Sequence, residues 1–234
     1  MSSRSPYACQ LPLFMFAILA FTLVLTPPAI SANESMPSIT VIEKKAKQGD
    51  AHSQYLLGSL YDQGEQIPKD LNNALIWYRK AAAQGHAKAQ FNLGRLYDLG
   101  EGVAENNKEA LKWYRKAAEQ GDVSGQFSLG AMYYTGDGVE LDNTEAAKWF
   151  RRAARQGDVD AQFLLARMYF EGEGVQQDYV KAYSWFHLSA ANGNTIAADH
   201  RNRIGKIITK EQRAEGQKLS KRLIKDSARQ PAPL

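Results

Sequence analysis

The sequence contains almost no cysteine. Cys9 is the only one among 234 residues, and it lies ahead of the apolar run that begins at Leu11. If the N-terminal segment is removed on export, the mature chain has no cysteine at all. This excludes a disulfide-stabilised framework and any metal site built on thiolates.

Histidine is also scarce, and the common catalytic motifs are absent. No Gly-x-Ser-x-Gly or Ser-x-x-Lys motif marks a nucleophile, and no His-x-x-x-His or Glu-x-x-His pair marks a metal site. The four histidines are His52, His86, His187 and His200. We therefore expect no catalytic residue, no cofactor and no metal, and we expect that the protein is not an enzyme.

The chain has one long apolar run, which is short for a membrane span. Leu11 to Leu25 is 15 residues long, whereas a spanning helix needs about 20. Residues 26–32 bring two prolines and small residues, as at a cleavage site after Ser31 or Ala32. We expect residues 1–32 to be a cleaved signal peptide. Arg4 is the only charge before the run, so an uncleaved membrane anchor is the alternative.

What the chain does have is a 36-residue repeat without insertions. The residues that return at this step are Gly49, Gly85, Gly121, Gly157 and Gly193; Trp77, Trp113, Trp149 and Trp185; Gln54, Gln90, Gln126 and Gln162; and Tyr61, Tyr97, Tyr133 and Tyr169. Such a period is typical of stacked units, each too small to bury its apolar face alone. An open stack presents a long surface, which favours binding over catalysis.

Each repeat is predicted to be a pair of helices. In the second copy, residues 87–99 contain no proline and place apolar side chains on one helical stripe. The Gly-Glu-Gly-Val turn at 100–103 then breaks the helix. Asn106 is an expected N-cap for the next helix, and Glu109 completes a capping-box pattern. The other expected N-caps of second helices are Asp70, Asp142 and Asp178, and Glu145 repeats the box.

Small residues are expected to let the two helices of a pair approach closely, with tryptophan and tyrosine filling the core between them. The small positions are Gly58, Gly94, Gly130 and Ala166. We expect replacement of one tryptophan by alanine to cost about 3–5 kcal/mol.

The copies share the pattern Ala-x-x-Gln-aromatic-x-Leu-Gly-x-x-Tyr, Gly-x-Gly-Val, Asx-x-x-x-Ala-x-x-Trp-aromatic and Ala-Ala-x-x-Gly. This pattern resembles the Sel-one-like repeat family, a relative of the tetratricopeptide repeats. The resemblance implies an all-α fold, a right-handed α-solenoid of antiparallel helix pairs whose first helices line a concave face. It also implies a scaffold or adaptor role. Some disulfide-rich secreted members are described as penicillin-binding or β-lactamase-like, and the lack of cysteine separates this chain from them.

On this reading the chain divides into a signal peptide at 1–32, an N-terminal half-repeat helix at 33–48, and four repeats at 49–84, 85–120, 121–156 and 157–192. A degenerate fifth repeat with a capping helix follows at 193–228, and a disordered tail at 229–234. The capping helix is expected at 209–226, with Thr209 and Gln212 as a capping box. Its apolar residues, expected to cover the end of the stack, are Ala214, Leu219, Leu223 and Ile224.

The charge of the chain gathers at its C-terminal end. The net charge is +4, and residues 199–234 hold ten basic and four acidic residues. A basic helix and tail could touch anionic lipid, cell-wall polymer or nucleic acid, although a solvated cap is the favoured interpretation. Nucleic acid is not expected as a partner, since an export signal is present and no nucleic-acid module is visible.

A binding face should consist of exposed positions that differ from repeat to repeat, while the framework residues beside them stay the same. Residues three, seven, ten and fourteen after each leading glycine share one side of the first helix. They are His52, Leu56, Ser59 and Gln63; Lys88, Asn92, Arg95 and Leu99; Ser124, Ser128, Ala131 and Thr135; and Asp160, Leu164, Arg167 and Glu171. We expect a protein or peptide partner to bind there, with Arg95 and Arg167 as anchors for carboxylates.

The repeat pattern and the signal peptide together indicate a monomeric bacterial protein that is periplasmic or secreted, or anchored in the inner membrane if the signal is retained. The favoured function is a non-catalytic scaffold or adaptor of the cell envelope. A hydrolase acting on cell wall or β-lactam, by family analogy, and a regulator of a partner enzyme are the alternatives.

Overall fold

The computed structural model describes residues 38–227, where all regular secondary structure is helical. The first helices of the four pairs are α2 (Ala51–Gln63), α4 (Ala87–Leu99), α6 (Val123–Thr135) and α8 (Val159–Glu171). The second helices are α3 (Leu71–Ala83), α5 (Asn107–Glu119), α7 (Asn143–Arg155) and α9 (Tyr179–Ala191). The remaining helices are α1 (Ile39–Lys47), α10 (Thr195–Ile207) and α11 (Lys210–Ser227). The expected all-α solenoid of 36-residue helix pairs is confirmed.

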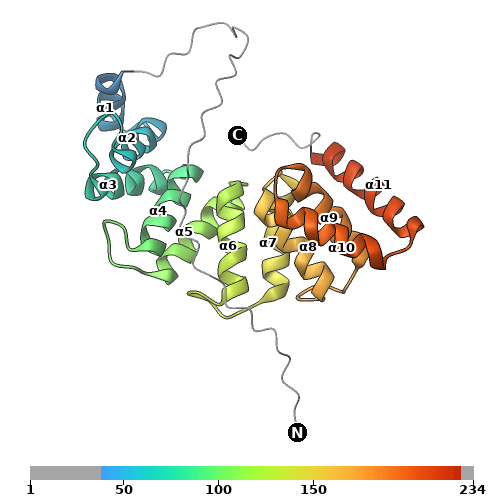
Figure 1. Ribbon diagram of the computed structural model, residues 1–234. Helices are drawn as coiled ribbons and strands as arrows, with labels where there is room; N and C mark the ends of the chain where they lie inside the picture. Colours follow the sequence, from blue (N-terminus) through green and yellow to red (C-terminus); the bar gives the residue numbers. More distant parts are fainter. Residues whose placement is uncertain (1–37, 228–234) are drawn as a thin grey trace, which may run out of the picture. The chain divides into compact units, whose positions relative to one another are not determined.

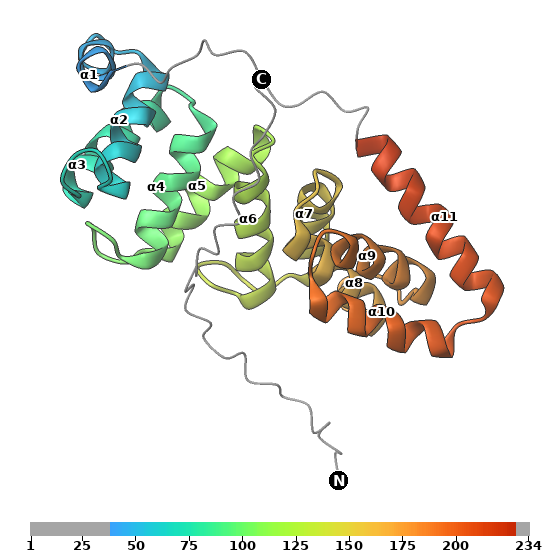
Figure 2. The same cartoon turned by 45° about the horizontal axis from the view of Figure 1, so that its top comes forward.

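Each helix from α1 to α10 packs against the next one in the chain, so that pair follows pair in one row (Figure 1). The lone helix α1 packs on α2 in the way that a second helix packs on the following pair. Helix α11 departs from this order, since it packs along α9 and also contacts α7. Figure 2 shows α11 as the last helix, running back from the end of α10. The row is therefore continuous, and only its last helix folds back on it.

The expected N-caps begin the helices where the sequence places them. The Asn106 side chain accepts a hydrogen bond from the backbone N–H of Glu109, and Asp70, Asp142 and Asp178 cap their helices in the same way. The capping box is only half formed, however. Glu109 bonds Lys112 instead of the Asn106 backbone, because that N–H already donates to the Tyr97 carbonyl of the preceding helix at 2.8 Å. The Asn106 N–H therefore links the two helices of the pair, instead of completing a capping box as it would at the start of an isolated helix.

Close approach of the paired helices depends on glycine, as expected. A Cβ on Gly94 would lie 2.7 Å from Cδ1 of Tyr114, and one on Gly130 would lie 2.8 Å from Cδ1 of Phe150. Gly58 meets Tyr78 in the same manner. Since real Cβ atoms do not approach this closely, a side chain at these positions would push the pair apart.

The expectation that the tryptophans form the core is wrong for three of the four. Trp77, Trp113 and Trp149 are half-buried. The fully buried aromatic is the residue that follows each tryptophan, and the set is Tyr78, Tyr114, Phe150 and Phe186. A cation lies over each of the three half-buried indoles, for example Arg152, whose Cζ lies 4.4 Å from the centre of the Trp149 ring. The tryptophan side chain instead packs against the core cluster between the first helix of its own pair and the helix that precedes the pair.

A chain of buried glutamines joins successive pairs. Gln90 is 4 % exposed, its Nε2 donates to the Ala82 carbonyl at 3.1 Å, and its Oε1 accepts from Gln120 at 2.6 Å. The same bonds recur at Gln54, Gln126 and Gln162. A buried amide left without these partners would be costly, so this chain of bonds holds each pair in register with the one before it.

The turn of the first repeat differs from the others, as its missing glycine suggests. Gly102, Gly138 and Gly174 have φ values of 69°, 71° and 65°, whereas no non-glycine residue of the described chain has a positive φ. Gln66, the equivalent residue, therefore turns with an ordinary backbone.

The capping helix begins as expected, and of its expected apolar residues Leu223 packs against the core, but other residues make its closest contacts. Thr209 and Gln212 exchange both bonds of a capping box, at 2.9 and 3.2 Å. Ala214 and Ile224 are exposed, contrary to expectation. The buried contacts are made by Gly216, whose carbonyl accepts a hydrogen bond from Ser184 at 2.9 Å, and by Ser220. Small residues let α11 lie close to α9, where large apolar ones had been expected to cover the end of the row.

The segments expected to be a signal peptide, 1–32, and a disordered tail, 229–234, lie outside the described residues. Among the helices that the structure describes, a search for a segment with the length and hydropathy of a bilayer span finds none.

Candidate functional site

The sixteen side chains expected at the binding surface all lie on the first helices α2, α4, α6 and α8. None of them is buried; eight are exposed and eight half-buried. We call the surface that they form the first-helix face. Leu99 is 58 % exposed, and Leu56 and Leu164 are half-buried. The face therefore offers both polar and apolar contacts to solvent.

Neighbouring first helices touch one another through this face. Arg95 of α4 pairs with Asp62 of α2. Arg167 of α8 donates a hydrogen bond to the Tyr134 hydroxyl of α6 at 2.9 Å. These contacts join α2 to α4 and α6 to α8, and the pocket described below is lined by residues at the starts of α2, α4 and α6 together. The first-helix face therefore runs along the whole row.

The two arginines are not free anchors for a partner. Besides Asp62, Arg95 contacts Glu101, with Nη1 at 2.6 Å from Oε2. Arg167 also lies 3.7 Å from the Glu171 carboxylate. Both guanidinium groups thus already have acceptors within the chain, which weakens their expected role in binding carboxylates of a partner.

A pocket opens at the N-terminal ends of α2, α4 and α6, on the first-helix face. Its volume is about 410 Å³, and it is lined by His52, Tyr55, Gly85, His86, Ala87, Lys88, Gln120 and Asp122. The rings of Tyr55 and His86 stack with centres 4.6 Å apart. Two residues of the expected set, His52 and Lys88, therefore border a concave site.

The protonation of this pocket is set by burial and by helix capping. Burial lowers the pKa of His86, and the neighbouring His52 and Lys88 lower it further. Its Nδ1 accepts the N–H of Ala89 at 3.3 Å, so the proton of the neutral ring is on Nε2, which faces His52 Nδ1 at 3.4 Å. Burial also raises the pKa of Asp122. The pocket thus combines a neutral imidazole, an aromatic ring and a partly desolvated carboxylate.

Reasoning from sequence missed two residues of this pocket, Tyr55 and Asp122. Asp122 reads in sequence only as a helix N-cap, and Tyr55 falls on the apolar stripe. The one available signal was His86, which stands where the other repeats have aspartate.

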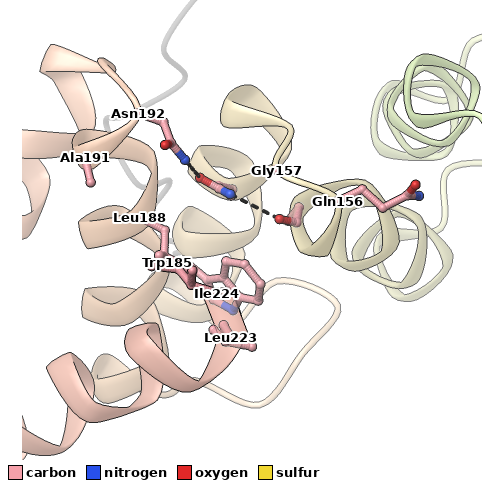
Figure 3. Close-up of a pocket in the computed structure, with 10 residues that line it drawn as sticks. Gln156, Gly157, Trp185, Leu188, Ala191, Asn192, Leu223 and Ile224 are labelled. Atoms are coloured by element: carbon pink, nitrogen blue, oxygen red, sulfur yellow. Dashed lines mark hydrogen bonds between the residues drawn. The ribbon is translucent and has the colours of Figure 1, made fainter. Parts of the chain in front are cut away.

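A second pocket, of about 260 Å³, lies between the end of α7, the start of α8, and helices α9 and α11. Figure 3 shows Trp185, Leu188, Leu223 and Ile224 around it. Leu188 stands where the other repeats have a cation over the indole. The apolar surface that this change creates is partly covered by α11, which explains why α11 folds back here.

Within residues 38–227, no group of three or more histidine, cysteine, aspartate or glutamate side chains is arranged to hold a metal ion. What the first-helix face can do is form hydrogen bonds, ion pairs and apolar contacts.

Comparison with known proteins gives one family. The sequence model of the Sel1 repeat matches residues 51–86, 87–122, 123–158 and 159–194. These boundaries follow the same period as our division and begin two residues later. Repeats of this kind generally form non-catalytic scaffolds for protein interactions. Among curated protein sequences, none matches the chain significantly.

Two solved structures are similar in both sequence and fold. A Sel1 repeat protein from Oxalobacter formigenes is 35% identical, with a TM-score of 0.67 over 71% of this chain and 48% of its own length. A protective antigen present in uropathogenic Escherichia coli strains, which displays an SLR fold, is 34% identical, with a TM-score of 0.55 over 81% of this chain and 49% of its own. This chain therefore spans about half the length of each.

Proposed function

Because the chain belongs to the Sel1 repeat family, we propose that it is a non-catalytic scaffold or adaptor that binds a partner protein or peptide on its first-helix face. The observation that carries the proposal is the contrast within each repeat. The buried contacts of glycine with aromatic residues within each pair, and those of glutamine between pairs, recur with little change. The side chains of the first-helix face differ in size and charge from repeat to repeat although the face is continuous. Exposed side chains that vary beside a fixed framework, along a face that runs through all four repeats, suit recognition of a specific partner.

We further propose that the protein works in the bacterial cell envelope. The support is the sequence of residues 1–32, which has the layout of a cleaved export signal. The partner would then be another envelope protein. N-terminal sequencing of the exported chain tests this step, and a first residue at or near Ala32 or Asn33 is the expected result.

The binding face is tested by affinity capture with two matched double variants. Asn92→Glu with Ser124→Glu adds two charges to the first-helix face. Asn72→Glu with Thr144→Glu adds two charges to exposed positions at the start of second helices. The tagged wild type is used to capture a partner from the cells that make the protein, and the captured protein is identified by mass spectrometry.

We expect the first-helix variant to lose the partner and the second-helix variant to retain it, with equal helicity by circular dichroism for all three chains. Retention by the first-helix variant, or loss by the second-helix variant alone, would reject this face as the binding surface.

A further inference from the structure

The three junctions between neighbouring first helices are built alike, and two of them contain an arginine. At the first junction, Arg95 of α4 lies between two carboxylates. One is Asp62, on the preceding first helix, and the other is Glu101, in the turn after α4. At the third junction, Arg167 of α8 donates to the Tyr134 hydroxyl at 2.9 Å. That hydroxyl donates in turn to Glu173, in the turn after α8, at 3.0 Å.

At the middle junction the arginine is missing. The residue 36 positions after Arg95 and before Arg167 is Ala131. The acceptors on both sides are nevertheless retained, because Asp98 stands at the position of Asp62 and Asp137 at the position of Glu101. By the repeat, a cation at this junction would lie between two carboxylates, as Arg95 does.

The local frame of the middle junction matches that of the first. The Tyr114 hydroxyl donates to Asp98 Oδ2 at 3.1 Å, and the Tyr78 hydroxyl donates to Asp62 Oδ2 at 3.2 Å. The two aspartates are therefore held in the same way by the second helix behind them. The difference is the cation, since no ion pair in the described part of the chain includes Asp98 or Asp137.

The electrostatics of Asp98 fit a carboxylate that lacks a counter-charge. Burial is the main cause that raises the pKa of Asp98, and Asp137 and Glu105 raise it further, while the Tyr114 hydroxyl opposes them. A half-buried charge flanked by like charges is costly until a cation arrives. The expected contact residues of α6 around it are small, namely Ser128, Ala131 and Thr135. The Thr135 hydroxyl donates a hydrogen bond to Asp137 Oδ2 at 2.6 Å, so among the described residues Asp137 has a neutral donor but no cation.

We propose that the space over Ala131, between Asp98 and Asp137, receives the guanidinium group of an arginine side chain of the partner protein. This inference rests on the proposed function, since it assigns one contact of the first-helix face. Arginine fits better than lysine because its fork of N–H donors can bond two acceptors at once, as Arg95 does at the first junction. The partner would thus supply in trans the group that the chain supplies to itself at both neighbouring junctions.

The test is an NMR titration of the isotopically labelled chain with N-acetyl-L-arginine amide. A single charge-assisted contact in a half-exposed site predicts a dissociation constant on the order of 10 mM. We expect saturable shifts confined to the amides of residues 98–101 and 131–138. N-acetyl-L-lysine amide should bind more weakly, and N-acetyl-L-glutamine amide should give no saturable shift.

Two variants test whether the ligand binds at Asp98 and Ala131. Asp98→Asn keeps the hydrogen bond from Tyr114 but removes the charge, and should weaken binding about tenfold. Ala131→Arg should fill the site from within the chain, abolish the shifts, and lower the pKa of Asp98 in a carboxyl-carbon titration. That last readout does not depend on the affinity of the small ligand.

Arg95→Ala serves as the positive control, because it should create an equivalent site between Asp62 and Glu101 that takes up the same ligand. If Arg95→Ala gains such a site while the wild type shows no saturable shift near Ala131, the proposal is wrong. It is also wrong if Ala131→Arg leaves the pKa of Asp98 unchanged or still binds the ligand. Neither result affects the outcome of the capture experiment above, whose variants change Asn92, Ser124, Asn72 and Thr144 and leave Asp98, Ala131 and Asp137 in place.

Discussion

At the scale of single residues, the residue that recurs most regularly in the repeat is not the most buried one. Tryptophan marks the period, but the indole of Trp149 lies at the border of two pairs under a cation, and Phe150 beside it is fully buried. Sequence predicts that both are apolar positions on one helix. It does not show which of two adjacent aromatic residues faces the partner helix, because that depends on how the two helices are rotated against each other.

This difference predicts unequal costs for two neighbouring substitutions. Phe150→Ala removes a ring packed against Gly130 and should lower the free energy of unfolding by about 3–5 kcal/mol. Trp149→Ala should cost clearly less, since its ring is half exposed and part of its contact is a surface cation–π pair. Urea unfolding of both variants measures the difference, and an equal or larger loss for Trp149→Ala would contradict the assignment of the core.

The contacts of Arg95 are a second feature that the sequence does not reveal at the scale of single residues. Its partner Asp62 is 33 residues away and on another pair. In sequence, both read as exposed charges on separate helices. The pairing becomes visible only when the pairs are stacked, which is why Asp98, at the equivalent position, was also missed as a site residue.

At the scale of elements, helix starts and ends follow from local chemistry and were predictable. The Asx residues before each second helix accept the N–H bonds that open the helix, and glycines of positive φ close the first helices. The direction of α11 was not predictable. It depends on Gly216 and Ser220, residues that look unremarkable in sequence and matter only because they allow contact with α9.

Two glycines near the C-terminal end give a matched test of how α11 docks. A Cβ on Gly216 would lie 2.8 Å from Cδ1 of the buried Tyr183, so Gly216→Ala should displace α11 although alanine favours helix. Gly205→Ala adds the same methyl group in α10, where the nearest atom is 3.5 Å away.

Hydrogen exchange followed by mass spectrometry distinguishes the two. We expect faster exchange throughout α11 in Gly216→Ala and unchanged or slower exchange in Gly205→Ala. Unchanged protection of α11 in Gly216→Ala would show that its docking does not depend on this close contact.

At the scale of the whole described chain, charge is distributed unevenly. Residues 38–194 hold 18 basic and 20 acidic side chains, whereas residues 195–227 hold 9 basic and 4 acidic ones. The first-helix face therefore belongs to the part of the chain that is close to neutral, where single unpaired groups such as Asp98 can decide which partner side chains fit. The solenoid could be predicted from the period, the helical pattern within each repeat and the resemblance to the repeat family. Which groups on its face are already paired could not, since that requires the neighbouring repeats in place.

The most direct test of the account is site-specific photo-crosslinking in the cells that make the protein. Benzoylphenylalanine would replace Lys88, Ser124 or Asp160 at the second residue of a first helix. At the same place in a second helix it would replace Asn72, Lys108 or Thr144, and all six positions are exposed. The account predicts one discrete adduct, of the same partner, from the first-helix positions and none from the second-helix positions. Adducts from the second-helix positions with none from the first would contradict it.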